Sequence, residues 1–232
     1  MKPRIEFLDF VAGAREARGL AVVIDVFRAF SVACYATAGG VRRIHPVAEI
    51  ETALALRAAN PGWLCAGERH ARKLPGFDFG NSPTEIEVAD LAGRTLMHTT
   101  HAGTQGLCAA TLAEEVITGS LVNAAAICRY IAAREPPVVS LVRMGHEARA
   151  RCAEDDLCAD LIAARLEGRD FDIAAVRPTL RQAPAAQKFF DPAADWAPQR
   201  DFELCTAVDR FDFVLALRGR GGPLPWLERI AA

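Results

Sequence analysis

The 232-residue sequence has little excess charge of either sign, because 27 lysines and arginines nearly balance 29 aspartates and glutamates. A net charge of −2 excludes the basic surplus with which proteins bind the phosphates of nucleic acid. It equally excludes a polybasic attachment to an anionic membrane. We therefore expect neither a nucleic acid nor a membrane as a partner.

Long apolar runs and paired cysteines are also missing. No apolar stretch approaches the ~18 residues of a membrane span, and none near the N-terminus suits a signal peptide. The seven cysteines include no Cys-x-x-Cys pair, which argues against a structural zinc site and a thioredoxin-like redox motif. We expect free thiols and a cytoplasmic location.

The glycine-rich signatures of nucleotide binding are absent as well. The first predicted strand is not followed by G-x-G-x-x-G, and no Walker A pattern occurs in the sequence. A nucleotide-binding oxidoreductase is therefore disfavoured.

Apolar runs alternate with helical patterns along the first two thirds of the chain. Residues 20–27 (LAVVIDVF) predict a strand buried on both faces, and repeated strand–helix alternation predicts a mostly parallel sheet with helices on both sides. The further predicted strands are 43–47, 63–66, 95–100, 115–118, 138–143 and 213–218, and the predicted helices are 28–38, 49–59, 104–112, 123–134, 154–166 and 205–211.

The pattern weakens after Gly168. We interpret residues 1–232 as one α/β domain in which residues 168–232 form a C-terminal extension. Alanine-rich helices and an apolar last strand favour a homodimer.

Polar residues follow most of the predicted strands. Ligands of open parallel sheets bind outside the carboxyl ends of the strands, so these residues should meet at one edge. The segments concerned are Asp25 to Arg28, Gly67-Glu68-Arg69, Thr99 to Thr104, Gly119-Ser120, Gly145-His146-Glu147 and Glu154-Asp155-Asp156.

The residue types at this edge suit a phosphate group and a hard cation. Arginine matches phosphate oxygens in a bidentate way, and Gly/Thr/Ser turns at helix starts offer backbone N–H groups to an anion. Several carboxylates without a Cys/His cluster favour Mg²⁺ over zinc. The sequence therefore predicts phosphoryl transfer or hydrolysis at a magnesium site.

Structural explanations compete with these roles. Asp25 lies in an apolar stretch, where a carboxylate is costly unless it is metal-bound or paired, for example with Arg28. The acidic residues 154–156 equally suit a helix start. His101, in a glycine turn, is slightly more typical of a surface than of a catalytic histidine. The other histidines expected to be structural or exposed are His45, His70 and His98.

Six segments together resemble the 2-phosphosulfolactate phosphatase family. The loop Gly76-Phe77-Asp78-Phe79-Gly80-Asn81-Ser82-Pro83 is the most specific of them, and the resemblance is close over residues 5–168 and loose beyond. The other segments are Asp25 to Ala29, Ala66 to Arg69, Thr99 to Thr104, Gly119 to Ala124 and Glu154 to Ala159.

The resemblance implies a three-layer α/β/α fold and a Mg²⁺-dependent phosphatase. The reaction after which the family is named converts 2-phospho-3-sulfolactate to 3-sulfolactate and phosphate, in coenzyme M biosynthesis. It implies catalytic roles for Asp25, Arg28 and Glu68, and metal ligation by Asp25, Glu68, Glu154 and Asp155. The residues it implies for substrate binding are Arg69, Asn81, Ser82, Thr99, Thr100, Gly103, Thr104 and Ser120.

Two departures from the family pattern fall in the expected pocket. The family reads T-T-T-N-G-T where residues 99–104 read T-T-H-A-G-T, so that Ala102 replaces an asparagine. Ala148 replaces the second glycine of a G-x-x-G turn, which is expected to reshape a turn with positive φ. The alternative is a divergent, non-catalytic binder of a small phosphorylated or sulfonated acid. Both a metal-activated water and a carboxylate stay open as the nucleophile.

Overall fold

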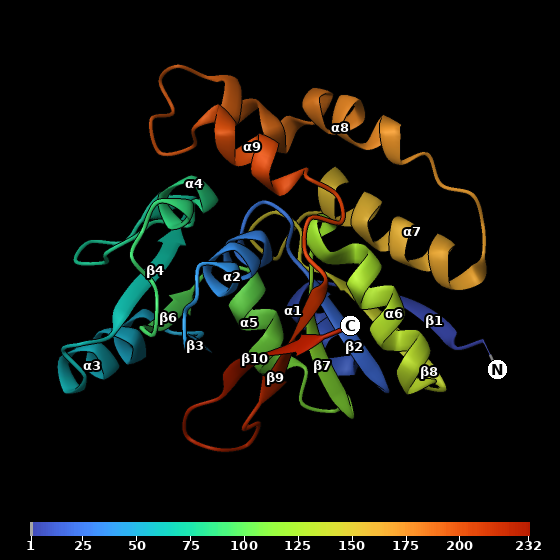
Figure 1. Cartoon of the computed structure of the whole chain (residues 1–232), viewed down its shortest axis with the longest axis horizontal. Helices are drawn as coiled ribbons and strands as arrows, with labels where there is room; N and C mark the ends of the chain where they lie inside the picture. The colour runs from blue at the N-terminus through green and yellow to red at the C-terminus, as the bar shows by residue number, and fades with distance from the viewer. Residues whose placement is uncertain (1) are drawn as a thin grey trace.

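The computed structural model describes residues 2–232 as a ten-stranded sheet with helices on both faces (Figure 1). The strands are β1 (Arg4–Asp9), β2 (Leu20–Ile24), β3 (Arg43–Pro46), β4 (Leu64–Arg69), β5 (Arg72–Lys73), β6 (Thr95–Thr99), β7 (Glu115–Gly119), β8 (Val138–Arg143), β9 (Phe213–Arg218) and β10 (Trp226–Ala231). The helices are α1 (Phe10–Glu16), α2 (Ala29–Ala38), α3 (Ile50–Ala59), α4 (Pro83–Glu87), α5 (Gly103–Ala109), α6 (Ala124–Arg134), α7 (Ala153–Glu167), α8 (Ile173–Gln182) and α9 (Gln199–Cys205), with 3₁₀ helices η1 (Leu121–Asn123) and η2 (Pro184–Phe190).

Strand β2 shows how the three layers arise. All five of its residues are buried, and successive side chains point to opposite faces of the sheet. Ala21 and Val23 belong to the core shared with α1, α2 and α5. Leu20, Val22 and Ile24 belong to the core shared with α6, α7, α8 and α9. The predicted three-layer α/β/α fold with a mostly parallel sheet is confirmed.

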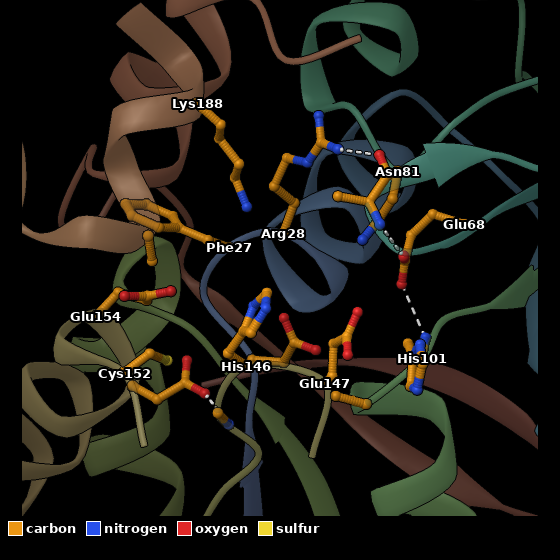
Figure 2. Close-up of a pocket in the computed structure, with 16 residues that line it drawn as sticks. Phe27, Arg28, Glu68, Asn81, His101, His146, Glu147, Cys152, Glu154 and Lys188 are labelled. Atoms are coloured by element: carbon orange, nitrogen blue, oxygen red, sulfur yellow. Dashed lines mark hydrogen bonds between the residues drawn. The ribbon is translucent and has the colours of Figure 1, made fainter. Parts of the chain in front are cut away.

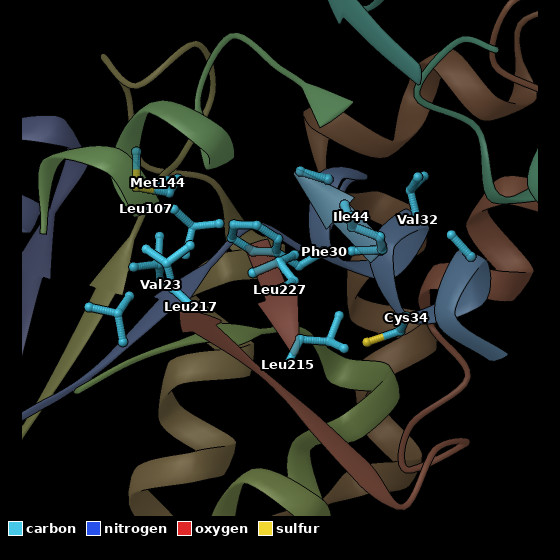
Figure 3. Packing of buried hydrophobic residues seen from close by; sticks show 14 of the residues in the cluster. Val23, Phe30, Val32, Cys34, Ile44, Leu107, Met144, Leu215, Leu217 and Leu227 are labelled. Carbon is cyan, nitrogen blue, oxygen red and sulfur yellow. The ribbon is translucent and has the colours of Figure 1, made fainter. Parts of the chain in front are cut away.

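Helix α2 is packed into the first of these cores along most of its length. Eight of its ten residues are buried, from Ala29 to Ala36. Phe30 is fully buried and lies beside Leu227 of β10 (Figure 3). Burial of a side chain of this size contributes about 1.5–3 kcal/mol to folding. This packing fixes the start of α2, which directly follows Asp25 and Arg28.

The sheet consists of two parallel blocks joined by an antiparallel hairpin. One block is β1-β8-β2-β7 and the other is β3-β6-β4, whose outer edge carries the short strand β5. The hairpin β9–β10 lies between the blocks and pairs with each through one bridge, Ile117–Ala216 and Leu227–Ile44. The carboxyl ends that carry polar residues therefore belong to two blocks.

Several predicted boundaries were wrong. The strand predicted for residues 20–27 ends at Ile24, because Val26 continues the apolar pattern in a loop packed on the second core. The helix predicted for 205–211 lies earlier, at Gln199–Cys205, directly after Pro198. The sequence analysis missed strands β1 and β10. Most residues of both strands are exposed or half-buried, so neither forms the continuous apolar run by which the other strands were predicted.

The C-terminal residues pass over the carboxyl end of β2 and then enter the sheet. In Figure 1, α8 and α9, in orange, arch above the strands, while the red hairpin β9–β10 lies among them. Helix α9 contacts α4 and η2. Within residues 2–232, no helix combines the length and the apolar character needed to cross a membrane.

Candidate active site

A narrow cavity of about 60 Å³ lies where the carboxyl ends of strands from both blocks meet (Figure 2). Asp25 follows β2 and Glu147 follows β8 in one block, while Glu68 ends β4 and His101 follows β6 in the other. Residues of η2 close the cavity from the C-terminal segment. The site therefore needs both blocks and the C-terminal extension.

Four of the five carboxylates that line this cavity are less than a tenth exposed. The structure thus brings together the whole predicted set of metal-ligating residues, although a role in metal binding stays a prediction. A cluster of like charges away from water is unfavourable unless protons or cations neutralise it. These residues are Asp25, Glu68, Glu154 and Asp155.

Two of the carboxylates are held by backbone N–H groups at both oxygens. Asp155 accepts hydrogen bonds from Val26 N (2.9 Å, Oδ1) and Gly145 N (2.8 Å, Oδ2), which ties the ends of β2 and β8 to α7. Glu68 accepts from Ala71 N and from His101 N, both at 2.8 Å. Asp155 and Glu68 therefore position the walls of the cavity.

The other two carboxylates keep an oxygen free within the described chain. Asp25 accepts a hydrogen bond from Ala29 N at Oδ1 (3.1 Å), whereas Glu154 Oε2 is buried with no partner in residues 2–232. Gly103 makes room for Asp25, since a Cβ at this glycine would lie 2.8 Å from Asp25 Oδ2. Asp25 and Glu154 are thus the oxygen donors best placed to hold a hard cation.

Burial dominates the protonation of this cluster. It raises the pKa of Asp25 from 3.8 to about 7, and the charge of Asp155 adds to that effect. The pKa of Asp155 is also raised to about 7 by burial and by Glu154. The pKa of Glu154 is raised mainly by burial. A bound cation would favour the charged form of all three groups.

Arg28 provides one positive charge at the cavity. Its Nη1 forms a buried ion pair with Asp201 of α9 at 2.6 Å and also donates to Trp196 O. Its Nη2 donates to Ala71 O at 3.1 Å. The alternative of an Asp25–Arg28 pair was wrong, because the partner is Asp201. A guanidinium has five N–H donors, so two remain for a ligand in the cavity.

Lys188 of η2 provides a second positive charge, which the sequence analysis missed. Its side chain points into the space between Phe27 and Arg28 (Figure 2), and it has neither a hydrogen bond nor an ion pair within the described chain. Burial, with a contribution from Arg28, lowers the pKa of Lys188. The half-buried ammonium lies 5.1 Å from the centroid of the Phe189 ring but has no anionic partner within the described chain, which suits an anionic ligand. In the sequence, Lys188 is a single lysine followed by two phenylalanines, and no motif there indicates a role in ligand binding.

Most of the predicted substrate-binding residues lie behind the wall of the cavity. Asn81 alone of the eight lines it. Ser82 donates to Asp201 Oδ1 (2.7 Å), Ser120 bonds Ser31 (2.8 Å), and Arg69 donates to Ala48 O (2.9 Å) and Thr99 Oγ1 (3.1 Å). Thr100 and Thr104 bond each other. These hydrogen bonds support the walls of the cavity, and the substrate contacts of all eight residues stay predictions.

The two departures from the family pattern border the cavity. Ala102 lines it directly. Ala148 has φ +54° and Glu147 has φ +50°, so this turn keeps a left-handed backbone without its second glycine. Glu147 and His146 of the same turn also line the cavity, and the sequence analysis assigned neither of them a role.

Comparisons with known proteins agree with these motifs. A family model described as 2-phosphosulpholactate phosphatase matches residues 11–220. A probable 2-phosphosulfolactate phosphatase of Caldanaerobacter subterraneus is 33% identical over 211 residues, which cover 85% of this chain and 87% of that protein. Proteins given the same name in Thermotoga petrophila and Bacillus subtilis are 33% and 29% identical, over 85% and 90% of this chain and 88% and 91% of their own lengths.

Replacing Asp201 tests the buried ion pair. Asp201→Asn removes the charge that compensates Arg28, and loss of one member of a buried pair costs about 3–5 kcal/mol. We expect thermal unfolding to shift down by roughly 10 °C for a chain of this size. Glu203→Gln, on the exposed side of the same helix, is the matched control and should leave the melting temperature unchanged. Equal melting temperatures for both variants would contradict a stabilising role for the pair.

Replacing Asp25 tests the carboxylate cluster. The pKa of Asp25 is raised from 3.8 to about 7, so its contribution to stability is present at low pH and is lost as the pH rises through that range. Asp25→Asn removes this loss while an amide oxygen can still accept from Ala29 N. In EDTA, the variant should melt at least about 2–4 °C higher than wild type at pH 8, corresponding to ~1 kcal/mol. The difference should shrink at pH 5, and a variant less stable at pH 8 would refute the interpretation.

Proposed function

This chain belongs to the 2-phosphosulfolactate phosphatase family, and we propose that its cavity hydrolyses the phosphate monoester of a small acid with the help of Mg²⁺. The proposed substrate is 2-phospho-3-sulfolactate or a close analogue. One observation carries the proposal: buried carboxylates face Arg28 and Lys188 across a single small cavity. A phosphate ester needs cations around its oxygens, and a metal-assisted hydrolase also needs carboxylates to hold its metal.

Asp25 and Glu154 are the residues that would hold the metal. Both offer carboxylate oxygens, the ligands that Mg²⁺ prefers, and Glu154 Oε2 is buried without a partner among the described residues. When bound, Mg²⁺ would neutralise charge on the phosphate and lower the pKa of a coordinated water. Glu68 and Asp155 lie in the same cavity and accept backbone hydrogen bonds that hold its walls.

Arg28 and Lys188 would bind the phosphate. The two guanidinium N–H groups of Arg28 that no described residue engages, together with the ammonium of Lys188, stabilise the negative charge on the phosphoryl oxygens. The ion pair with Asp201 fixes Arg28 before a ligand enters, so little reorganisation is needed during the reaction.

The reaction itself exchanges one oxygen at phosphorus for another. A nucleophilic oxygen forms a bond to phosphorus while the ester P–O bond breaks. The leaving oxygen takes up a proton to become the product's hydroxyl, and the water that is consumed gives up one proton. The nucleophile is either a water or the Asp25 carboxylate, whose Oδ2 accepts no hydrogen bond within the described chain. A carboxylate route adds a second step, in which water releases phosphate from the acyl phosphate.

The activity test is release of inorganic phosphate from a panel of phosphorylated acids, with Mg²⁺ and with EDTA. Wild type should depend on Mg²⁺, and Asp25→Asn should lower turnover by at least about 100-fold, because one charged ligand is lost. Circular dichroism checks that the variant is folded. Near-normal turnover of Asp25→Asn would refute the assignment. Ligand binding by wild type with no phosphate release would favour the non-catalytic alternative.

Lys188→Met tests the second cation. The substitution removes the ammonium but keeps an unbranched apolar side chain, so it should lower kcat/KM by about 10–100-fold, the value of a charge-assisted hydrogen bond of ~1.5–3 kcal/mol. Lys73→Met is the matched control, because Lys73 is exposed on β5 and does not line the cavity. Equal kcat/KM for both variants would exclude Lys188 from phosphate binding.

A further inference from the structure

Two turns with unusual backbones face each other at the mouth of the cavity. His70 (φ +52°) and Ala71 (φ +61°) form the two-residue turn between β4 and β5, and Glu147 (φ +50°) and Ala148 (φ +54°) form the turn after β8. None of these residues is glycine, so each left-handed conformation costs about 1 kcal/mol or more. The two turns hold these conformations while they bring His70 and Glu147 into contact.

His70, Glu147 and His101 form a cluster of three metal-ligating side chains from three different loops. His70 Nδ1 lies 2.6 Å from Glu147 Oε1, and the rings of His70 and His101 lie 5.1 Å apart between centroids. One ligand atom from each residue lies within 4.8 Å of the other two. His101 Nδ1 is buried and has no hydrogen-bond partner in residues 2–232.

We propose that His70, His101 and Glu147 bind a divalent transition metal of the Zn²⁺ class, at a site separate from the carboxylates of Asp25 and Glu154. Two imidazoles and one carboxylate are a frequent ligand set for zinc, whereas Mg²⁺ prefers oxygen ligands alone. Ligand atoms at ~2.0–2.1 Å from a tetrahedral zinc lie about 3.4 Å apart. His70 Nδ1 and Glu147 Oε1 must therefore move apart from 2.6 Å, and any ligand atoms more than about 3.4 Å apart must approach one another. The His70 side chain is 73% exposed and therefore has room to make this adjustment.

The sequence also sets this cluster apart from the family pattern. His101 stands where that pattern has the third threonine of T-T-T-N-G-T. Because His101 and Glu147 line the cavity, a metal held by three protein ligands would keep its remaining coordination position close to the cavity. A plain His70–Glu147 ion pair would explain one contact, but it leaves the buried His101 Nδ1 without a role.

The test is direct titration of the full-length protein with Co²⁺, a spectroscopic substitute for Zn²⁺, in the presence of saturating Mg²⁺. Visible absorption of bound Co²⁺ reports its ligands, and competition by Zn²⁺ reports the affinity for zinc. We expect one Co²⁺ bound per chain. The affinity for Co²⁺ should be at least about tenfold lower in His70→Gln and in His101→Gln, because each variant loses one residue that binds the metal directly. Circular dichroism monitors folding, and Glu147→Gln provides a third variant for the same ligand set.

Two control variants exclude other metal sites. Cys108 is the exposed free thiol, and Cys108→Ser should leave the spectrum and the affinity unchanged. Asp25→Asn should also retain Co²⁺ binding, because the proposed site does not use Asp25. Unchanged affinity in folded His70→Gln and His101→Gln, or loss of the signal in either control, would overturn the proposal. Binding is measured without substrate, so a failure of the proposed phosphatase activity would be seen separately.

Discussion

The buried ion pair between Arg28 and Asp201 organises the functional end of the molecule. Asp201 is fully buried on α9, and it accepts hydrogen bonds from Ser82 Oγ and Thr84 N as well as from Arg28. Three segments far apart in the sequence therefore meet at one carboxylate. Their connection matters because α9 contacts η2, the element that carries Lys188 into the cavity. The pair thus positions both cations of the site, one by direct contact and one through the packing of the C-terminal extension.

The carboxylates opposite these cations are held at a cost in stability. Backbone N–H groups fix Asp155 and Glu68 at both oxygens, but hydrogen bonds from neutral donors do not remove the repulsion between buried negative charges. Loss of solvation, together with this repulsion, raises the pKa values of Asp25 and Asp155. Such a cluster leaves the site ready for a positively charged ligand, which would offset this cost.

The sequence predicted the carboxylate half of the site better than the cationic half. Asp25, Glu68, Glu154 and Asp155 follow or begin recognisable elements, so the rule for carboxyl ends of strands places them at one edge. Lys188 lies in a segment without periodicity, and its role depends on how that segment folds back over β2. Hydroxyl residues such as Ser82 and Ser120 were expected at the ligand, but a serine bonds equally well to a buried neighbour. The packing of α2 and α9, which supplies these neighbours, cannot be read from local pattern.

The hairpin β9–β10 has a consequence for how the chain acquires its structure during synthesis. These strands follow both parallel blocks in the sequence, yet they lie between the blocks and form one strand-pairing bridge with each. Until residues 213–231 have left the ribosome, the blocks lack the strands that join them. Contacts between such distant parts of a sequence form late, because closing long loops is entropically costly. The nascent polypeptide can therefore build each block as it emerges, but the cavity takes its final form only after β9 and β10 have joined the sheet.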